Sequence, residues 1–471
     1  MNRSIAVAAA IVALATSAAA QTGARRKPTT KPAPSYAFPK VQTRTLPNGM
    51  TVEIVENHSL PLVAVRTVIE GGALLDPQGK EGLYALDIAL LRDGTTSMNG
   101  VELAQALDEL GATVTPTSFT TITGELDKAL PLMGDMLMHP TFAPDAVDRR
   151  KAALKSTLQR AEGDANAVAN RLLNTILFGP EHPFGRAATQ ASVSSITRDD
   201  LVAFHSANVR PQNVTLVIVG DVTPTSVMPL VTTVFGGWEK TGERVSVKVP
   251  SGIASQPTYI YLFDRPGAPQ TTVRFGQVGP MRSSPDYYAF DLAMSIFGAT
   301  GSSQLAQSLR EQHKLTYSVT HVASWRGWNE PSVIVGSAQV DAAKTDSALL
   351  VWMSELKNFA DTSHEITPQD LEFGRSVTVG SLATRFETFD AIANEVVSMV
   401  QNHLPMTFVD DYVHYVKMIP AKGVSIVAHR FLNPTHTAII VVGDRKTIEL
   451  PLRAANVGPV IPVDATGKSI P

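Results

Sequence analysis

Cysteine is absent from this chain of 471 residues. Its absence excludes disulfide bonds, zinc sites built on thiolates and cysteine nucleophiles. A marked excess of one charge is also missing, because 40 lysines and arginines stand against 43 aspartates and glutamates. A nucleic-acid-binding protein normally shows a basic face, so this balance argues against that function. After residue 20, no stretch long enough to span a membrane is free of charged side chains.

What is present is the composition of a globular protein. Hydrophobic residues make up 44% of the chain and charged residues 18%, which suits a protein that buries sizeable cores. Since a domain usually takes about 100–200 residues, we expect two or more domains.

The first 20 residues have the pattern of a secretory signal peptide. Arg3 supplies the positive start, and the apolar run over residues 5–20 ends in three alanines. We therefore expect cleavage near Ala20 and a periplasmic or secreted protein, with a retained membrane anchor as the alternative. Residues 21–39 are rich in proline, threonine, alanine and lysine, which predicts a flexible lead-in.

The chain contains an internal repeat. Residues 210–221 and 432–444 each begin with a polar turn, continue as a β-branched strand and end in Gly-Asp, at Asp221 and Asp444. Aligning the two aspartates gives a repeat of 223 residues and predicts two similar halves. We expect a first domain over residues 40–236, a polar linker over 237–257, a second domain over 258–450 and a tail over 451–471. The repeated strands, 213–221 and 435–444, should be central and not catalytic.

The order of expected elements also recurs between the halves. Asn48-Gly49 is a tight-turn signal between two strands, and alternation over residues 63–69 predicts another. Apolar residues at helical spacing predict helices over 82–91, 101–110, 127–137 and 146–161. The second half offers strands over 258–263 and 271–275 and a helix over 286–297. Strands and helices in blocks predict an α+β fold of two homologous domains, each an antiparallel-rich sheet packed with helices.

Several landmarks resemble the pitrilysin/insulinase-type zinc metallopeptidases. They are, in the order of that family, Leu46-Pro-Asn-Gly-Met-Thr-Val52, Gly71-Gly-Ala-Leu-Leu-Asp76, His182-Pro-Phe-Gly185, the strand ending in Gly220-Asp221, and Ser303-x-Leu305-x-x-x-Leu309-Arg310-Glu311 leading to Leu315-x-Tyr317-Ser318. The resemblance covers residues 44–444. It implies that the two domains form half of a clamshell that encloses peptide.

The sequence departs from this family at the metal site. Active members carry His-x-x-Glu-His on a helix, where two histidines bind zinc and the glutamate takes a proton from the zinc-bound water. The resemblance places Ala85 and Ala89 at the histidine positions and Ile88 at the glutamate position. None of these side chains can bind metal or transfer a proton. The family's third ligand falls in residues 152–158, which hold no carboxylate, although an offset would make Glu162 the match. We expect no catalytic residue, no metal site and no cofactor in this chain.

A replacement site is hard to find in the sequence. No histidine lies in His-x-x-Glu-His or its inverse, and Gly-x-Ser-x-Gly does not occur. Each histidine is interpreted as a surface or capping residue. Asp87 is interpreted as a solvated helix position, and Asp93 as a turn residue before Gly94.

A peptide-binding surface remains. In the two-subunit bacterial members that the sequence resembles, one chain carries zinc, and its partner contributes an arginine and a tyrosine that hold the substrate backbone. The matching residues here are Arg310 and Tyr317. A guanidinium or a phenol hydroxyl can donate to a peptide carbonyl. Arg310 could instead be a cation at a helix C-terminus, and Tyr317 a strand core residue.

Three hypotheses follow. The first is a non-catalytic subunit of a zinc metallopeptidase complex, paired with a zinc-bearing homologous subunit and binding an extended peptide by edge-strand addition. The second is a stand-alone peptide-binding or scaffold protein of the cell envelope. The third is an active metalloendopeptidase with an unrecognised site. The first hypothesis places the zinc in the partner subunit.

Overall fold

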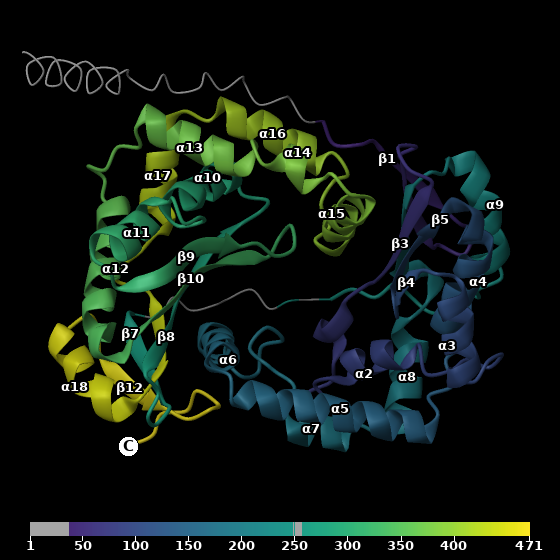
Figure 1. Cartoon of the computed structure of the whole chain (residues 1–471), viewed down its shortest axis with the longest axis horizontal. Coiled ribbons are helices and arrows are strands. Elements are labelled where there is room, and N and C mark those ends of the chain that lie inside the picture. The colour runs from purple at the N-terminus through teal and green to yellow at the C-terminus, as the bar shows by residue number, and fades with distance from the viewer. Residues whose placement is uncertain (1–36, 248, 250–256) are drawn as a thin grey trace, which may run out of the picture. The chain divides into compact units, whose positions relative to one another are not determined.

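The computed structural model of this chain describes residues 37–247, 249 and 257–471 (Figure 1). The expected signal peptide, almost all of the lead-in and part of the linker lie outside the described residues. Within the described part, every helix is too short or too polar to cross a membrane.

The first half of the chain forms a six-stranded sheet. Its strands lie in the order β1-β2-β6-β3-β5-β4. β2 and β6 are parallel and all other neighbours are antiparallel. The Asn48-Gly49 turn joins β1 to β2, as predicted. The strand bounds are β1 (Val41–Thr45), β2 (Thr51–Glu56), β3 (Leu62–Ile69), β4 (Thr113–Thr115), β5 (Ser118–Ile122) and β6 (Val214–Gly220).

The second half repeats this arrangement. The order is β12-β7-β11-β8-β10-β9, and β7 is parallel to both β11 and β12. Five strands correspond one to one with the first sheet, and the fully buried β6 and β11 occupy equivalent inner positions. The predicted α+β fold with antiparallel-rich sheets is confirmed. The strand bounds are β7 (Tyr259–Asp264), β8 (Gln270–Met281), β9 (Thr316–Ser324), β10 (Pro331–Asp341), β11 (Ala438–Gly443) and β12 (Val460–Val463).

The prediction that residues 451–471 form a tail is wrong, because this segment contains a helix end and a strand of the second sheet. Helix α18 (Arg445–Ala455) continues past residue 450, and β12 then pairs with β7. Val460 and Val463 are buried there. Because this pairing covers the outer edge of β7, the segment is an integral part of the second domain.

Helices cover the first sheet and extend away from it. The four predicted helices are present as α2, α3, α4 and α5. α4 and α9 pack on the sheet around Phe119, Met133 and Phe235. The bounds are α2 (Leu83–Leu90), α3 (Gly100–Glu109), α4 (Leu126–Met138), α5 (Pro144–Glu162), α6 (Ala165–Phe178), α7 (Gln190–Ser195), α8 (Arg198–Asn208) and α9 (Pro224–Phe235).

The second half has its own core around Phe275, Phe290, Phe297 and Trp352. The predicted helix over 286–297 is present as α10. The bounds are α10 (Tyr287–Phe297), α11 (Gln304–Ala306), the π-helical η4 (Gln307–Gln312), α12 (Thr345–Phe359), α13 (Pro368–Thr378), α14 (Leu382–Arg385), α15 (Phe389–Gln401), α16 (Phe408–Met418) and α17 (Ala421–Phe431).

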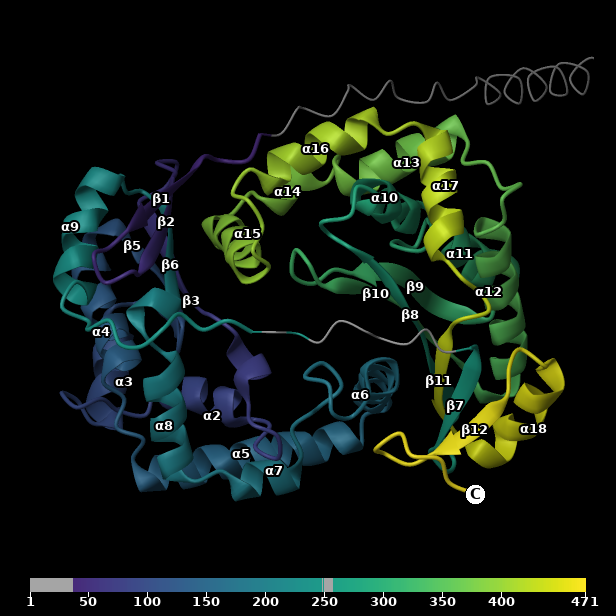
Figure 2. The same ribbon diagram turned by 180° about the vertical axis from the view of Figure 1, so that it is seen from behind.

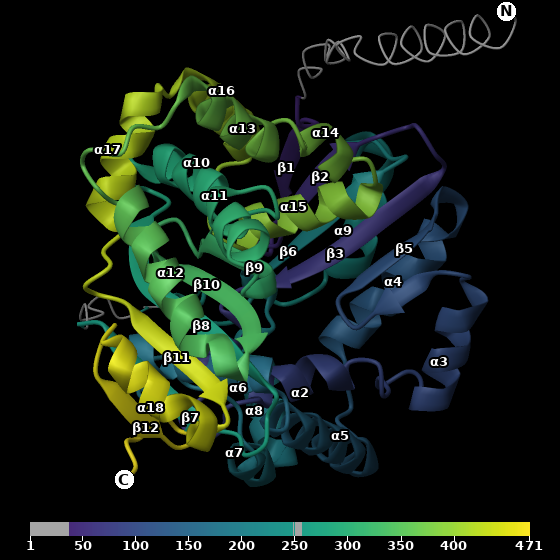
Figure 3. The ribbon, with the colours of Figure 1, turned by 60° about the vertical axis from the view of Figure 1, so that its left-hand side comes forward.

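The two halves exchange one helix each. Helix α6 of the first half packs on β8 and β11 of the second sheet (Figure 2). Helix α15 of the second half packs on β3 and β6 of the first sheet (Figure 3). Gly276 of β8 allows the close approach of α6, because a Cβ there would lie 2.2 Å from Leu173 Cδ1. Each sheet therefore has a layer that is encoded in the other half of the sequence.

Candidate functional site

Helix α2 occupies the place where the family motif would stand. The Asp76 carboxylate accepts hydrogen bonds from the backbone N–H groups of Gly82, at 2.7 Å, and Tyr84, at 2.8 Å. These bonds satisfy donors that would otherwise be orphaned at the start of the helix. Gly82 has φ of 104°, a conformation that glycine adopts without strain. The sharp entry into α2 thus follows from an acceptor and a glycine in the local sequence.

The degenerate positions share one face of α2. Leu83, Leu86 and Leu90 are buried against α5 and α8, whereas Ala85 is exposed and Ile88 and Ala89 are half-buried. Residues at this spacing lie side by side on a helix. Ala85, Ile88 and Ala89 thus occupy the more open side of the helix without offering a single metal donor.

The possible third ligand does not complete a site. Glu162 is the last residue of α5 and is exposed. Among the residues that the structure describes, no group of three or more histidines, aspartates or glutamates could hold a metal ion. The expectation that this chain binds no cofactor stays a prediction.

Asp87 is not the solvated helix residue that the sequence suggested. It is fully buried, and its Oδ1 lies 2.9 Å from Nδ1 of His205 on α8. His205 Nε2 lies 3.0 Å from the Leu137 carbonyl oxygen. Burial raises the pKa of Asp87, and the hydrogen bond from His205 opposes that rise. His205, interpreted as a surface or capping histidine, is not at the surface: it is buried, and it contacts a carbonyl in the last turn of α4.

Arg310 lies in η4, beside the glycine-rich loop that precedes it. Its Nε donates to Glu311 Oε1 at 2.6 Å, and its Nη2 donates to the Gly301 carbonyl at 3.3 Å. The side chain remains 37% exposed. Arg310 is therefore oriented by neighbouring groups while part of its guanidinium faces outward.

Tyr317 lies on β9, the edge strand of the second sheet, and is 91% exposed. This exposure excludes the alternative of a strand core residue. Tyr317 lines a cavity of about 450 Å³ that is bounded by β8, β9, β10 and the start of α6. Within the described residues, no hydrogen bond joins Tyr317 to Arg310. Substrate binding by these two residues stays a prediction.

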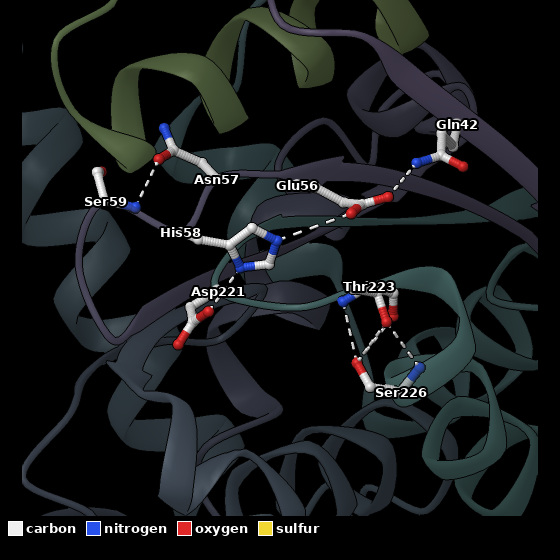
Figure 4. A network of polar contacts seen from close by, with 8 residues as sticks. All are labelled: Gln42, Glu56, Asn57, His58, Ser59, Asp221, Thr223 and Ser226. Atoms are coloured by element: carbon white, nitrogen blue, oxygen red, sulfur yellow. Dashed lines mark hydrogen bonds and ion pairs between the residues drawn. The ribbon is translucent and has the colours of Figure 1, made fainter.

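A polar network closes the carboxyl ends of β2 and β6 (Figure 4). His58 Nδ1 lies 2.7 Å from Asp221 Oδ1, and its Nε2 lies 3.7 Å from Glu56 Oε2. The hydrogen bond to Asp221 raises the pKa of the exposed His58. Because both ring nitrogens face carboxylates and neither faces a nucleophile, this network does not have the arrangement of a catalytic dyad. Asp221, one of the repeated Gly-Asp residues, serves here to join strand ends.

Comparison with known proteins bears on the family resemblance. Residues 195–377 match the family described as the peptidase M16 inactive domain. The chain is 23% identical over 417 residues to a non-peptidase homologue, YmxG, of Helicobacter pylori, covering 82% of this chain and 90% of that relative. The resemblance to the M16, pitrilysin/insulinase-type family is confirmed. An uncharacterised zinc protease of Mycobacterium leprae is 28% identical over 293 residues, covering 58% of this chain and 64% of that relative.

A solved structure confirms the M16 fold. The crystal structure of a peptidase M16 inactive domain from Pseudomonas fluorescens superposes with a TM-score of 0.75 at 22% identity. The alignment covers 86% of this chain and 98% of that one. The predicted fold class, two homologous α+β domains of the kind that form half of the M16 clamshell, is confirmed.

One residue of the cavity that Tyr317 lines was not predicted from the sequence as a site residue. Arg274 lies on β8 and lines the same cavity, although only 6% of the residue is exposed. Its Nη2 and Nε donate to Asn166 and Asn170 of α6. A second internal repeat could have drawn attention to this group, since Asn166-Ala-Val-Ala-Asn170 resembles Asp390-Ala-Ile-Ala-Asn394.

Proposed function

We propose that this chain is the exported, non-catalytic subunit of a two-chain zinc metallopeptidase that binds and degrades peptides. It pairs with a zinc-bearing homologue, helps to close the chamber and holds an extended peptide. The observation that carries this proposal is the open face of α2. There, Ala85, Ile88 and Ala89 occupy the positions at which the resemblance to active members requires two imidazoles and a carboxylate.

The second sheet supports the peptide-binding part of the proposal. β9 is the outermost strand on its side, so its outer edge has no partner strand among the described residues. An extended peptide can add to such an edge through main-chain hydrogen bonds, which tolerate many sequences. Tyr317 and Arg310 both stand where this edge begins. The match to an inactive M16 domain and to a relative named a non-peptidase homologue supports the part of the proposal that makes this subunit non-catalytic.

Reconstitution tests the proposal. The chain is purified alone and together with a homologue that bears His-x-x-Glu-His, and zinc content, association and peptide cleavage are measured for each sample. We expect the chain alone to cleave nothing and to hold no stoichiometric zinc. The complex should bind zinc and cleave peptide. One tightly held zinc in the isolated chain, with cleavage that a chelator abolishes, would establish an unrecognised metal site instead. Peptide binding without association to any such homologue would favour a stand-alone binding protein.

A further inference from the structure

Arg66 and Arg274 occupy equivalent positions in the two sheets. Arg66 of β3 lies opposite Val217 of β6, and Arg274 of β8 lies opposite Ile440 of β11. Val217 and Ile440 are related by the same shift of 223 residues that relates Asp221 to Asp444. Each arginine contacts the helix that its sheet receives from the other half of the chain.

The receiving positions on the two exchanged helices are also equivalent. Asp390 and Asn394 are the second and sixth residues of α15, and Asn166 and Asn170 are the second and sixth residues of α6. Arg66 forms an ion pair with Asp390 and a 3.5 Å hydrogen bond to Asn394.

Arg274 makes the corresponding contacts with amides. It donates to Asn166 at 2.8 Å and to Asn170 at 2.9 Å. The guanidinium of Arg66 is thus neutralised by a carboxylate, whereas the equivalent guanidinium of Arg274 receives only amide oxygens from the exchanged helix.

The charge of Arg274 is left without a direct partner. Within the described residues, no carboxylate oxygen lies within 4.0 Å of its guanidinium nitrogens, although the side chain is largely buried. Asp164 acts on it from farther away, and one of its oxygens accepts the N–H of Ala167 at the start of α6. Burying a charge without an opposite charge is costly. An anion supplied from outside would remove that cost.

The cavity gives such an anion access to the guanidinium. Three of the five N–H groups of Arg274 are taken by Asn170, Asn166 and the Val273 carbonyl. One N–H on each terminal nitrogen therefore has no acceptor among the described residues, and two such donors suit the two oxygens of a carboxylate. Lys314 lines the same cavity, and Asp341 is the acidic residue among its lining.

We propose that this cavity is a carboxylate-binding subsite, in which an anionic group of a bound peptide takes the place that Asp390 takes beside Arg66. The proposal rests on the proposed function in one respect, that the ligand is a peptide. Tyr317 lines the cavity at the edge of β9, so a peptide added to β9 passes its mouth. The carboxylate is either the C-terminus of the peptide or the side chain of an aspartate or glutamate.

Calorimetric titration of the isolated full-length chain tests the subsite. Three short peptides of one length are compared: one with a free C-terminus and no acidic residue, one amidated with a glutamate, and one amidated without any acid. We expect the first or the second to bind about tenfold or more tightly than the third, and the tighter of the two identifies the source. Equal affinity for all three would overturn the subsite and leave peptide binding intact. If none of the three bound, both the subsite and the peptide-binding part of the proposed function would fall.

Asn166→Asp is the decisive variant, because it copies the Asp390 arrangement. The new carboxylate should neutralise Arg274 without loss of thermal stability and should remove the preference for carboxylate-bearing peptides. Asn166→Ala is the matched control, since it removes the amide but leaves the charge free, and it should keep the preference. Arg274→Gln should also remove it. A preference that survives in a folded Asn166→Asp variant would overturn the assignment.

Discussion

The burial of single histidines could not be predicted from the sequence. His205 and His321, each interpreted as a surface or capping residue, are both buried. His321 lies on β9, and its Nδ1 accepts a hydrogen bond from Trp352 Nε1 at 3.0 Å. Burial lowers the pKa of His321 to about 3. Nothing in the neighbouring sequence signals this, because Trp352 is 31 residues away and reaches the ring only through the packing of α12.

His321 should make the fold sensitive to acid. The unfolded chain binds a proton at this residue below pH about 6.5, whereas the folded chain does so only near pH 3. The free energy of unfolding therefore falls as the pH drops through this window, by about 2 kcal/mol at pH 5. Urea unfolding at about pH 7.5 and pH 5 should show a smaller loss for His321→Gln, which keeps an amide oxygen near Trp352. Equal losses in both proteins would refute this assignment.

Arg310 should affect turnover and not assembly. In a reconstituted complex, Arg310→Ala should lower kcat by about tenfold or more, because an oriented donor to a substrate carbonyl is lost. Co-elution of the two chains should be unchanged. Arg453→Ala, which removes a similarly exposed arginine paired with Glu449 on α18, is the control and should leave both properties unchanged. Unaltered turnover in Arg310→Ala would remove the role assigned to this residue.

Elements were easier to predict than the contacts between them. Helix α2 follows from its apolar spacing, and the β1–β2 hairpin follows from Asn48-Gly49. The central β6 and β11 follow from their repeated apolar runs. The edge hairpin of β9 and β10 was missed.

Long-range contacts lay beyond the sequence patterns. Asp87 meets its partner 118 residues along the chain, and Arg274 meets Asn166 across 108 residues. Local patterns fix how a segment folds, whereas the identity of its neighbour depends on tertiary packing.

The open face of α2 should accept the missing motif without gaining activity. The triple variant Ala85→His, Ile88→Glu, Ala89→His changes exposed or half-buried positions, so its melting temperature should fall by only a few degrees. It should not cleave peptides, because residues 152–158 supply no glutamate as a third ligand. Thermal unfolding, zinc content and peptide cleavage are the measurements. Zinc-dependent cleavage by this variant would show that the rest of the metal site is intact.

At the scale of the whole molecule, the exchanged helices join the two halves. Leu172 and Leu173 of α6 share a core with Ile440 and Val442 of β11. Arg66 reaches Asp390 of α15 on the other side of the exchange. Each sheet therefore needs a helix from the other half of the sequence, α15 for the first sheet and α6 for the second.

Cutting the chain between the halves should not separate them. A protease site introduced between residues 247 and 257 should yield two fragments that co-elute and unfold in one transition, because α6 and α15 keep each fragment seated on the other. Gel filtration after cleavage and the melting curve check this. Asp390→Asn should lower the melting temperature of the cut protein, since it removes the ion pair with Arg66. Fragments that elute separately without denaturant would contradict the exchange.

The exchange also constrains the order in which the protein can mature. Helix α6 ends at Phe178, but β11, half of its docking surface, begins only at Ala438. A chain emerging from the ribosome therefore carries the apolar side of α6 uncovered until about 260 further residues have followed. Chaperones that bind exposed apolar helices could bind α6 during this interval. A product terminated before β11 would leave the apolar side of α6 exposed.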